Sequence, residues 1–380
     1  MAFSNHLSFP DRRDVMRGGA SLSFGALTSL LFSGASRALA APLRGGAPEI
    51  DQLVLRIVTD SYQMATAQNA KVGNVEIKRF GFAVGDHPPS KAILSEFGLS
   101  MHASSMLGSQ QRNVLVDFGY TPQTLLNNLE LLGIDPGAID ALVLSHGHYD
   151  HFGGLAGFLQ ATSGKLKPDL PFYFGGEECF CARQWLAPPM KGDFGAIDRD
   201  ALKSARLSIM SSPGPAKVAD HGFTTGRIDL TSFEKVLSPS AMTIGRSGAF
   251  GCFAEEFSEE ERQKGVIPDQ FRHEIGTAFN LKGRGLIVLT SCSHRGVVNV
   301  VKQAQAASGV EKVHAVVGGF HLAPHKEDYL RETVKALGAL NPDFVIPLHC
   351  SGEPFFEIMK AEMPTKLLRG YTGTEFVFAA

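Results

Sequence analysis

The sequence of 380 residues lacks the features that mark several common classes of protein. It contains no long run of charges of one sign, and its formal net charge is only −2. Proteins that bind nucleic acid normally carry a basic patch or stripe, so we expect no nucleic-acid partner. Beyond residue 40, no apolar stretch approaches the roughly 20 residues that a membrane-spanning helix needs. The rest of the chain is therefore predicted to carry no stable membrane anchor.

Motifs of the common nucleophilic and nucleotide-binding sites are absent as well. The chain has neither a GxSxG pattern nor a GxxxxGK(S/T) pattern, and its five cysteines include no CxxC pair. Cys179 and Cys181 are too close in sequence for an easy disulfide. We interpret Cys179, Cys181 and Cys252 as small buried hydrophobic residues, whereas Cys292 and Cys350 stand beside candidate metal ligands and are considered with them.

The N-terminal segment is typical of an export signal. Arg12 and Arg13 precede the stretch "ASLSFGALTSLLFSGASRALA", which ends in the small-residue triplet Ala38-Leu39-Ala40. This order predicts a cleaved signal of the twin-arginine type over residues 1–40. A membrane anchor is the alternative, but the stretch is rich in glycine and serine and only moderately hydrophobic. We expect residues 41–380 to form a single exported domain, periplasmic or secreted, and a homo-oligomer is compatible with the sequence.

The order strand, histidine, helix occurs four times along the chain. The predicted strands "IDALVLSH", "GLIVLTSCSH", "KVHAVVGGFH" and "PDFVIPLHC" cover residues 139–146, 285–294, 312–321 and 342–350. A helix preceded by Thr121 as its N-cap and beginning at Pro122 is predicted between earlier strands. The region of about 160–265 shows no catalytic pattern and is a possible insertion over the active site. These elements predict an α/β fold, in which ligands bind at the carboxyl ends of strands.

The stretch "SHGHYDHFGG" packs four potential metal ligands into six positions. His146 and His148 are two residues apart, so their rings project to one side of an extended segment. Asp150 and His151 follow where the chain turns, and they face a second point nearby. Imidazole and carboxylate suit zinc, iron or manganese, and two ions need more ligands than one segment supplies. The other strand ends offer these ligands: His294, His321 and His349.

Ordinary buried or surface histidines are the alternative interpretation, and the crowding in HxHxDH argues against it. For His321, a contact with substrate or with another ligand remains open. We predict two divalent metal ions, with zinc first and iron or manganese as alternatives.

The motif and its surroundings resemble the metallo-β-lactamase superfamily, whose signature is HxHxDH after a strand. Asp117 in "LVDFG" matches the superfamily aspartate that orients the metal site. The stretches "TTGRIDLTSFE", "TSCSHRGVVN", "GGFHL" and "LHCSG" are similar to its dihydropteroate synthase-like branch, named after a methanopterin-biosynthesis enzyme. The resemblance implies an αβ/βα sandwich with two mixed sheets and helices outside. Many members bridge their metals with an aspartate where this chain has Cys292, so either Cys292 or a water takes that place; Cys350 is interpreted as a packing residue.

Two adjacent cations lower the pKa of a shared water and make a bridging hydroxide available near neutral pH. Asp150 would bind one ion and orient the hydroxide or accept its proton. We therefore expect a metallohydrolase that cleaves an ester-type bond, a phosphoester or a lactone, in a small-molecule substrate. The branch name suggests a transferase joining a pterin-like diphosphate to an arylamine, although such substrates are cytosolic. A non-catalytic metal-binding protein is the third possibility.

Overall fold

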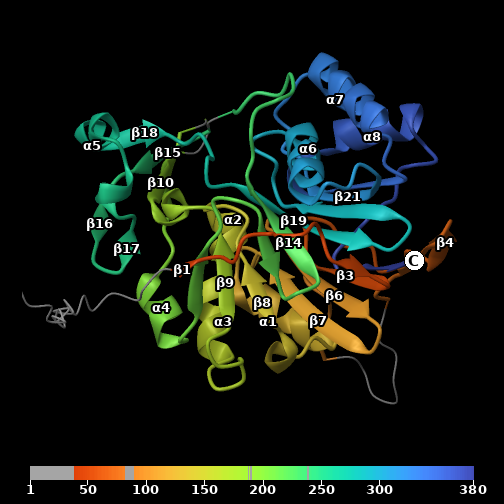
Figure 1. Cartoon of the computed structure of the whole chain (residues 1–380), viewed down its shortest axis with the longest axis horizontal. Coiled ribbons are helices and arrows are strands. Elements are labelled where there is room, and N and C mark those ends of the chain that lie inside the picture. The colour runs from red at the N-terminus through yellow and green to blue at the C-terminus, as the bar shows by residue number, and fades with distance from the viewer. Residues whose placement is uncertain (1–37, 82–89, 187, 189–190, 238) are drawn as a thin grey trace, which may run out of the picture. The chain divides into compact units, whose positions relative to one another are not determined.

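Two large β-sheets lie face to face in the computed structural model of the chain (Figure 1). The structure describes residues 38–81, 90–186, 188, 191–237 and 239–380. Most of the predicted export signal, residues 1–37, lies outside the described residues. Residues Ser36–Ala380 form one compact unit. No described helix is both long and apolar enough to cross a bilayer.

The first sheet has ten strands in the order β1-β12-β9-β8-β7-β6-β3-β23-β5-β4. Strands β7, β8, β9 and β12 run parallel to one another, and β3, β6 and β23 pair antiparallel. In chain order the strands are β1 (Ala38–Leu39), β3 (Gln52–Thr59), β4 (Ala70–Val72), β5 (Val75–Lys78), β6 (Ser100–Leu107), β7 (Gln110–Val116), β8 (Ala141–Val143), β9 (Pro171–Phe174), β12 (Ser208–Ser211) and β23 (Glu375–Ala379).

The second sheet has seven strands, six of them in the order β13-β14-β19-β20-β21-β22, with β2 paired to β19. Strands β20, β21 and β22 are parallel, so their carboxyl ends meet at one edge. The strands are β2 (Glu49–Ile50), β13 (Ala216–Val218), β14 (Gly222–Arg227), β19 (Ile275–Leu281), β20 (Gly285–Thr290), β21 (Val313–Gly319) and β22 (Phe344–Leu348).

Helices cover the outer face of each sheet (Figure 1). Helix α1 (Pro122–Leu131) and α3 (Leu155–Ala161) pack on the first sheet. Helices α6 (Val297–Ser308), α7 (Glu327–Leu340) and α8 (Glu353–Glu362) pack on the second. Helix α1 begins as the sequence predicts, since the Thr121 side chain accepts a hydrogen bond from the Thr124 amide.

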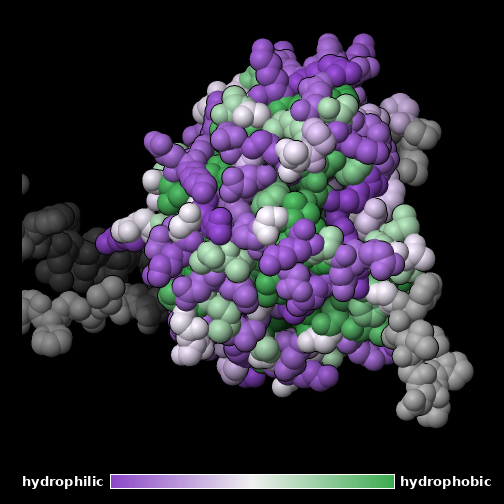
Figure 2. Space-filling view, turned by 90° about the vertical axis from the view of Figure 1, so that its right-hand side faces the viewer, coloured by the Kyte–Doolittle hydropathy of each residue, from purple (hydrophilic) through white to green (hydrophobic). Residues whose placement is uncertain are grey.

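Apolar side chains fill three interfaces, one between the sheets and one beneath each helical layer. In strand β20, successive side chains alternate between two of these interfaces. Ile287 and Leu289 enter the interface between the sheets, whereas Leu286 and Val288 face the helices. Hydrophilic residues cover most of the face that Figure 2 presents. The layers are therefore helix, sheet, sheet and helix, which confirms the predicted αβ/βα sandwich.

A smaller sheet of four strands, called the side sheet here, lies within the region that the sequence left unassigned. Its order is β11-β10-β15-β18, formed by β10 (Ala182–Trp185), β11 (Gly192–Gly195), β15 (Ser240–Thr243) and β18 (Val266–Pro268). The short hairpin β16 (Arg246–Ser247) and β17 (Phe250–Gly251), helix α4 (Arg199–Ser204) and helix α5 (Glu259–Lys264) belong to the same region.

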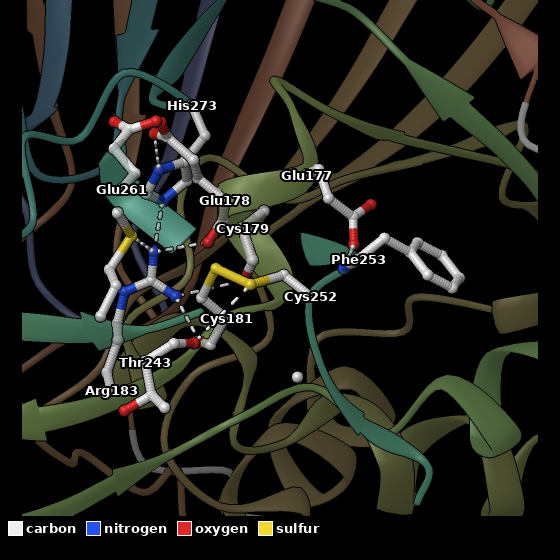
Figure 3. Close-up of a disulfide and its surroundings, with 12 residues drawn as sticks. Glu177, Glu178, Cys179, Cys181, Arg183, Thr243, Cys252, Phe253, Glu261 and His273 are labelled. Carbon is white, nitrogen blue, oxygen red and sulfur yellow. Dashed lines mark hydrogen bonds and ion pairs between the residues drawn. A yellow bond between two sulfur atoms is a disulfide. The ribbon is translucent and has the colours of Figure 1, made fainter. Parts of the chain in front are cut away.

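A disulfide between Cys181 and Cys252 joins the start of β10 to the residue after β17 (Figure 3). The interpretation of these two cysteines as unbonded small hydrophobic residues is therefore wrong. Both are fully buried, as predicted, but 71 positions separate them and no local sequence pattern pairs them. Cys179, Cys292 and Cys350 are buried free thiols.

Candidate metal centre

The predicted ligands come together where strands of both sheets end. His146 lies three residues after β8, and helix α2 (Tyr149–Phe152) carries Asp150 and His151. His294, His321 and His349 follow the parallel strands β20, β21 and β22. Strand β8 ends at Val143 rather than at the predicted residue 146. The residues that follow Val143 lie outside the strand and carry the candidate ligands.

His146, His148 and His294 form the first group of candidate ligands, with one ring nitrogen of each within 4.8 Å of the others. Neighbouring hydroxyls orient two of the rings. Ser145 Oγ lies 2.9 Å from His146 Nδ1, and Ser240 Oγ lies 2.9 Å from His148 Nε2. These contacts leave His146 Nε2 and His148 Nδ1 as the nitrogens for a metal, in the way that outer hydrogen bonds orient ligand histidines.

Asp150, His151 and His349 form the second group under the same distance limit. Asp117 lies beneath it, fully buried, and its Oδ2 is 2.7 Å from His151 Nδ1. The same carboxylate accepts hydrogen bonds from the amide and the hydroxyl of Ser145, at 2.8 and 2.7 Å. Asp117 thus connects the ligand segments of both groups, in the orienting position that the resemblance implied.

Cys292 lies between the two groups. Its Sγ is 3.4 Å from His151 Nε2, and it belongs to three of the five sets of side chains that are close enough to share an ion. One of these sets contains His294 and His321. Cys350 Sγ is 3.2 Å from Cys292 Sγ and accepts a hydrogen bond from the His321 amide. The thiol of Cys292 therefore lies close to ligands of both groups.

Burial sets the charge of these groups. Burial lowers the pKa of His148 to about 3 and those of His146 and His294 well below their usual value, so their imidazoles are neutral. Burial also lowers the pKa of His151, but the Asp150 and Asp117 carboxylates outweigh it and raise that pKa to about 10. The neutral imidazoles of His146, His148 and His294 are in the form that binds a divalent cation. His151 is protonated near neutral pH, so an ion that binds its ring would have to displace that proton.

Several buried polar atoms of the cluster have no hydrogen-bond partner within the described part of the chain. They include His146 Nε2, both ring nitrogens of His294 and Asp150 Oδ1. Buried polar atoms are nearly always satisfied, and an ion is one explanation for exceptions. Because the ligand atoms of each group also lie within 4.8 Å of one another, the residues fit two divalent metal ions.

Gly147, in the middle of the histidine motif, lies against a buried ion pair. An added Cβ would meet the Cys179 carbonyl oxygen at 2.3 Å and Arg183 Nη1 at 2.4 Å, so the position has room only for glycine. Arg183 is itself 1% exposed and pairs with Asp269 at 2.6 Å. His273 Nε2 accepts a hydrogen bond from the Gly147 amide at 3.1 Å. It accepts another from Arg183, also at 3.1 Å (Figure 3). This network holds the backbone of the motif.

Sequence reasoning missed these supporting residues. No motif in the sequence marks His273, Arg183 or Asp269 as part of the site. Glu274 was missed too; its carboxylate accepts hydrogen bonds from the His294 and Arg295 amides, and burial raises its pKa to about 7. The three polar residues "RHE" directly precede the apolar strand β19, which is a weak signal in the sequence, and only the fold shows what they contact.

The ligands open into a cavity of about 330 Å³. Its polar floor contains His148, Asp150, Cys292, His294, His321 and His349. Residues of the side sheet, Trp185 and Phe194, and two residues from other loops, Phe97 and Tyr120, form the walls. His146 and His151 are fully buried below the floor.

Comparisons with known proteins agree with this architecture. Residues 98–169, which contain the whole HxHxDH motif, match the family model described as the metallo-beta-lactamase superfamily. The solved structure of Tm1679, described as a metal-dependent hydrolase of the beta-lactamase superfamily, matches with a TM-score of 0.60 and 22% identity. The match covers 85% of this chain and 98% of that one.

Two curated proteins of Methanocaldococcus jannaschii are similar in sequence. The chain is 29% identical to 7,8-dihydropterin-6-methyl-4-(beta-D-ribofuranosyl)-aminobenzene-5'-phosphate synthase, over 68% of this chain and 82% of the relative. It is 25% identical to an uncharacterized protein, MJ0448, over 76% of this chain and 96% of that protein. Together with the layers described above, the comparisons show that the chain has the metallo-beta-lactamase fold.

Proposed function

We propose that this chain, which has the metallo-beta-lactamase fold, is a binuclear metallohydrolase that cleaves an ester-type bond in a small molecule. One observation carries the proposal: two groups of three ligands, His146/His148/His294 and Asp150/His151/His349, lie side by side around Cys292. One strand end supplies four of these six ligands, and two parallel strands of the other sheet supply the rest.

Two divalent cations bound here, zinc before iron or manganese, would supply a hydroxide near neutral pH and an electrophile for the substrate oxygen. The protein's own contribution is to hold the ligands rigidly. Asp117 fixes the ring of His151, and Ser145 and Ser240 fix those of His146 and His148. Cys292, which lies close to ligands of both groups, would be the thiol available to the two ions.

Asp150 is the proposed catalytic residue. Its Oδ2 lies 3.2 Å from His349 Nε2, and Oδ1 has no partner within the described residues. One carboxylate oxygen would bind an ion, and the other would orient the attacking group or accept its proton. His321 is half-buried on the cavity floor, beside His294, with ring centroids 4.1 Å apart. It is placed either as a further ligand or as a contact for the substrate.

Hydrolysis of a panel of phosphodiesters and lactones by the zinc-loaded protein tests this proposal. We expect turnover of one class, and a loss of at least about 10²-fold in kcat in D150N, because general acid–base groups contribute on this scale. A zinc-loaded protein that hydrolyses no member of either class would contradict the hydrolase proposal.

A synthase is the second candidate, because a curated relative with 29% identity is named as one. A transferase would join an arylamine to a pterin-like diphosphate and release diphosphate. Diphosphate release that requires the amine, with no hydrolysis in its absence, would favour this candidate over the hydrolase.

We also propose export through the twin-arginine pathway. The Cys181–Cys252 disulfide supports it, because structural disulfides persist mainly in oxidising compartments. Cleavage after Ala40 would remove β1, a two-residue edge strand whose side chains are exposed. The N-terminal residue of the protein recovered from a periplasmic extract, measured by mass spectrometry, tests this proposal; an intact residue 1 would contradict it.

A further inference from the structure

Four aromatic side chains from separate segments meet at the mouth of the metal cavity. Phe97 precedes β6, Tyr120 follows β7, Trp185 ends β10 and Phe194 lies in β11. Phe97 is 58% exposed and Tyr120 39% exposed, although most large apolar side chains of the described residues are buried. Exposed aromatic groups that line one cavity are typical of a ligand site.

Two of these rings lie directly beside candidate metal ligands. The centroid of Phe97 is 4.8 Å from that of His349, and the centroid of Phe194 is 5.1 Å from that of His148. Trp185 packs against Phe194 at 5.5 Å. A substrate whose reacting bond reaches the ions must therefore place its neighbouring atoms against aromatic surfaces.

The charged residues that line the cavity give its walls no single sign of charge. Lys191, which directly precedes β11, and Asp193 of β11 also line the cavity, and their charges are opposite. The Asp193 carboxylate already accepts a hydrogen bond from the Gly195 amide at 2.8 Å. The aromatic rings are consequently the feature of the walls that selects among ligands.

The side sheet holds this wall in a fixed relation to the metal ligands. Trp185 is paired in register with Ser240 of β15, and Ser240 Oγ contacts His148. The other end of β10 is fixed by the disulfide at Cys181 and by the buried ion pair of Arg183. A wall that is positioned before binding loses little entropy when a rigid ligand enters.

We infer that the substrate carries a planar conjugated ring, a substituted benzene or a fused heterocycle, next to the ester-type bond that is cleaved. This inference rests on the proposed function, since it identifies the substrate class of the same site. The ring stacks against Trp185 and Phe194 on one side of the cavity, with Phe97 and Tyr120 forming the rest of the mouth.

Binding of two matched anions to the zinc-loaded full chain tests the inference. Phenylphosphonate and cyclohexylphosphonate carry the same charged group and rings of the same number of carbons, and neither has an ester bond to hydrolyse. Trp185 is the only tryptophan of the chain, so its fluorescence reports binding at this wall. Calorimetry gives the dissociation constants for the variants, in which Trp185 is replaced.

We expect phenylphosphonate to bind about three- to tenfold more tightly than cyclohexylphosphonate, the range that aromatic pairing contributes beyond apolar contact. W185L should bring the ratio near one, whereas W185F, which keeps a planar ring, should retain most of it. Equal affinities in the wild type, an unchanged ratio in W185L, or no binding of either anion would overturn the inference.

The inferred preference for planar rings and the proposed hydrolase activity can each be contradicted without the other. A protein that hydrolyses esters without preferring the planar probe remains a hydrolase with a different substrate class. A protein that prefers the planar probe but hydrolyses neither phosphodiesters nor lactones keeps the ring site and loses the hydrolytic function.

Discussion

Asp117 connects the two groups of candidate ligands through three hydrogen bonds, although it touches neither proposed ion. Its carboxylate contacts the His151 ring and both polar groups of Ser145. In D117N, an amide replaces the acceptor that fixes the ring. We expect zinc affinity to fall about 10- to 100-fold, the usual effect of removing such a partner. Competition with a chromogenic chelator measures this change.

The chain offers a matched control for this substitution. Asp343 also accepts a hydrogen bond from a histidine, His314, at 2.7 Å, but neither belongs to the ligand groups. D343N should leave zinc affinity unchanged. If D117N and D343N both bound zinc like the wild type, Asp117 would not be an orienting residue.

A second prediction concerns Cys292, because a thiolate that binds a metal ion has a spectroscopic signature. Cobalt substituted for zinc should give a near-ultraviolet sulfur-to-cobalt charge-transfer band in the wild type. The band should vanish in C292A and persist in C179A, since Cys179 is buried behind Gly147 and belongs to none of the ligand groups. A wild type without the band would assign the bridging place to water, and a band that survives in C292A would come from another thiolate, such as Cys350, whose Sγ is 3.2 Å from that of Cys292.

The backbone conformation of several site residues could not be predicted from the sequence. Asp117, Ser293, His321 and His349 all have positive φ angles between 49° and 58°. Such a conformation is uncommon for residues other than glycine, and it clusters at functional sites. Each of these residues lies just after a strand, so the sequence predicted their proximity from the strand ends and could not predict how they turn.

At the scale of elements, the disulfide joins the start of β10 in the side sheet to the segment that follows the β16–β17 hairpin. It closes a loop of 71 residues, for which the loss of chain entropy in the unfolded state corresponds to about 4 kcal/mol. We expect the double variant C181S/C252S to lower the free energy of unfolding by up to that amount. Urea unfolding followed by circular dichroism measures it.

C179S provides the control for the disulfide, since Cys179 is equally buried but unbonded. It should change stability much less than the double variant does. A thiol titration under denaturing conditions should find three free thiols before reduction and five after it. Five free thiols before reduction would contradict the disulfide.

Long periodic elements were predictable from the sequence, and short ones were not. The capping residue and leucine spacing of α1 and the strands β20, β21 and β22 follow directly from local patterns. The strands of the side sheet contain only three or four residues each. Alternation over so few residues gives no distinct period, so the pocket wall with Trp185 and Phe194 stayed unassigned.

For the whole molecule, the repeated order of strand, histidine and helix was enough to predict the fold class and where the candidate ligands meet. What it could not predict are contacts between residues far apart that carry no motif. Arg183 and Asp269 are 86 positions apart, yet their ion pair supports the backbone at Gly147. Tertiary contacts of this kind depend on the assembled layers and leave no trace in a local pattern.

The metal content of the purified protein tests the central claim most directly. Elemental mass spectrometry of the zinc-reconstituted chain should find about two zinc ions per chain. H294A and H349A, which each remove a ligand from one group, should each retain about one. H325A should retain two, because His325 stacks on Tyr329 with centroids 3.8 Å apart and belongs to neither group. A wild type that binds no zinc, or variants that both keep two ions, would contradict the dinuclear centre.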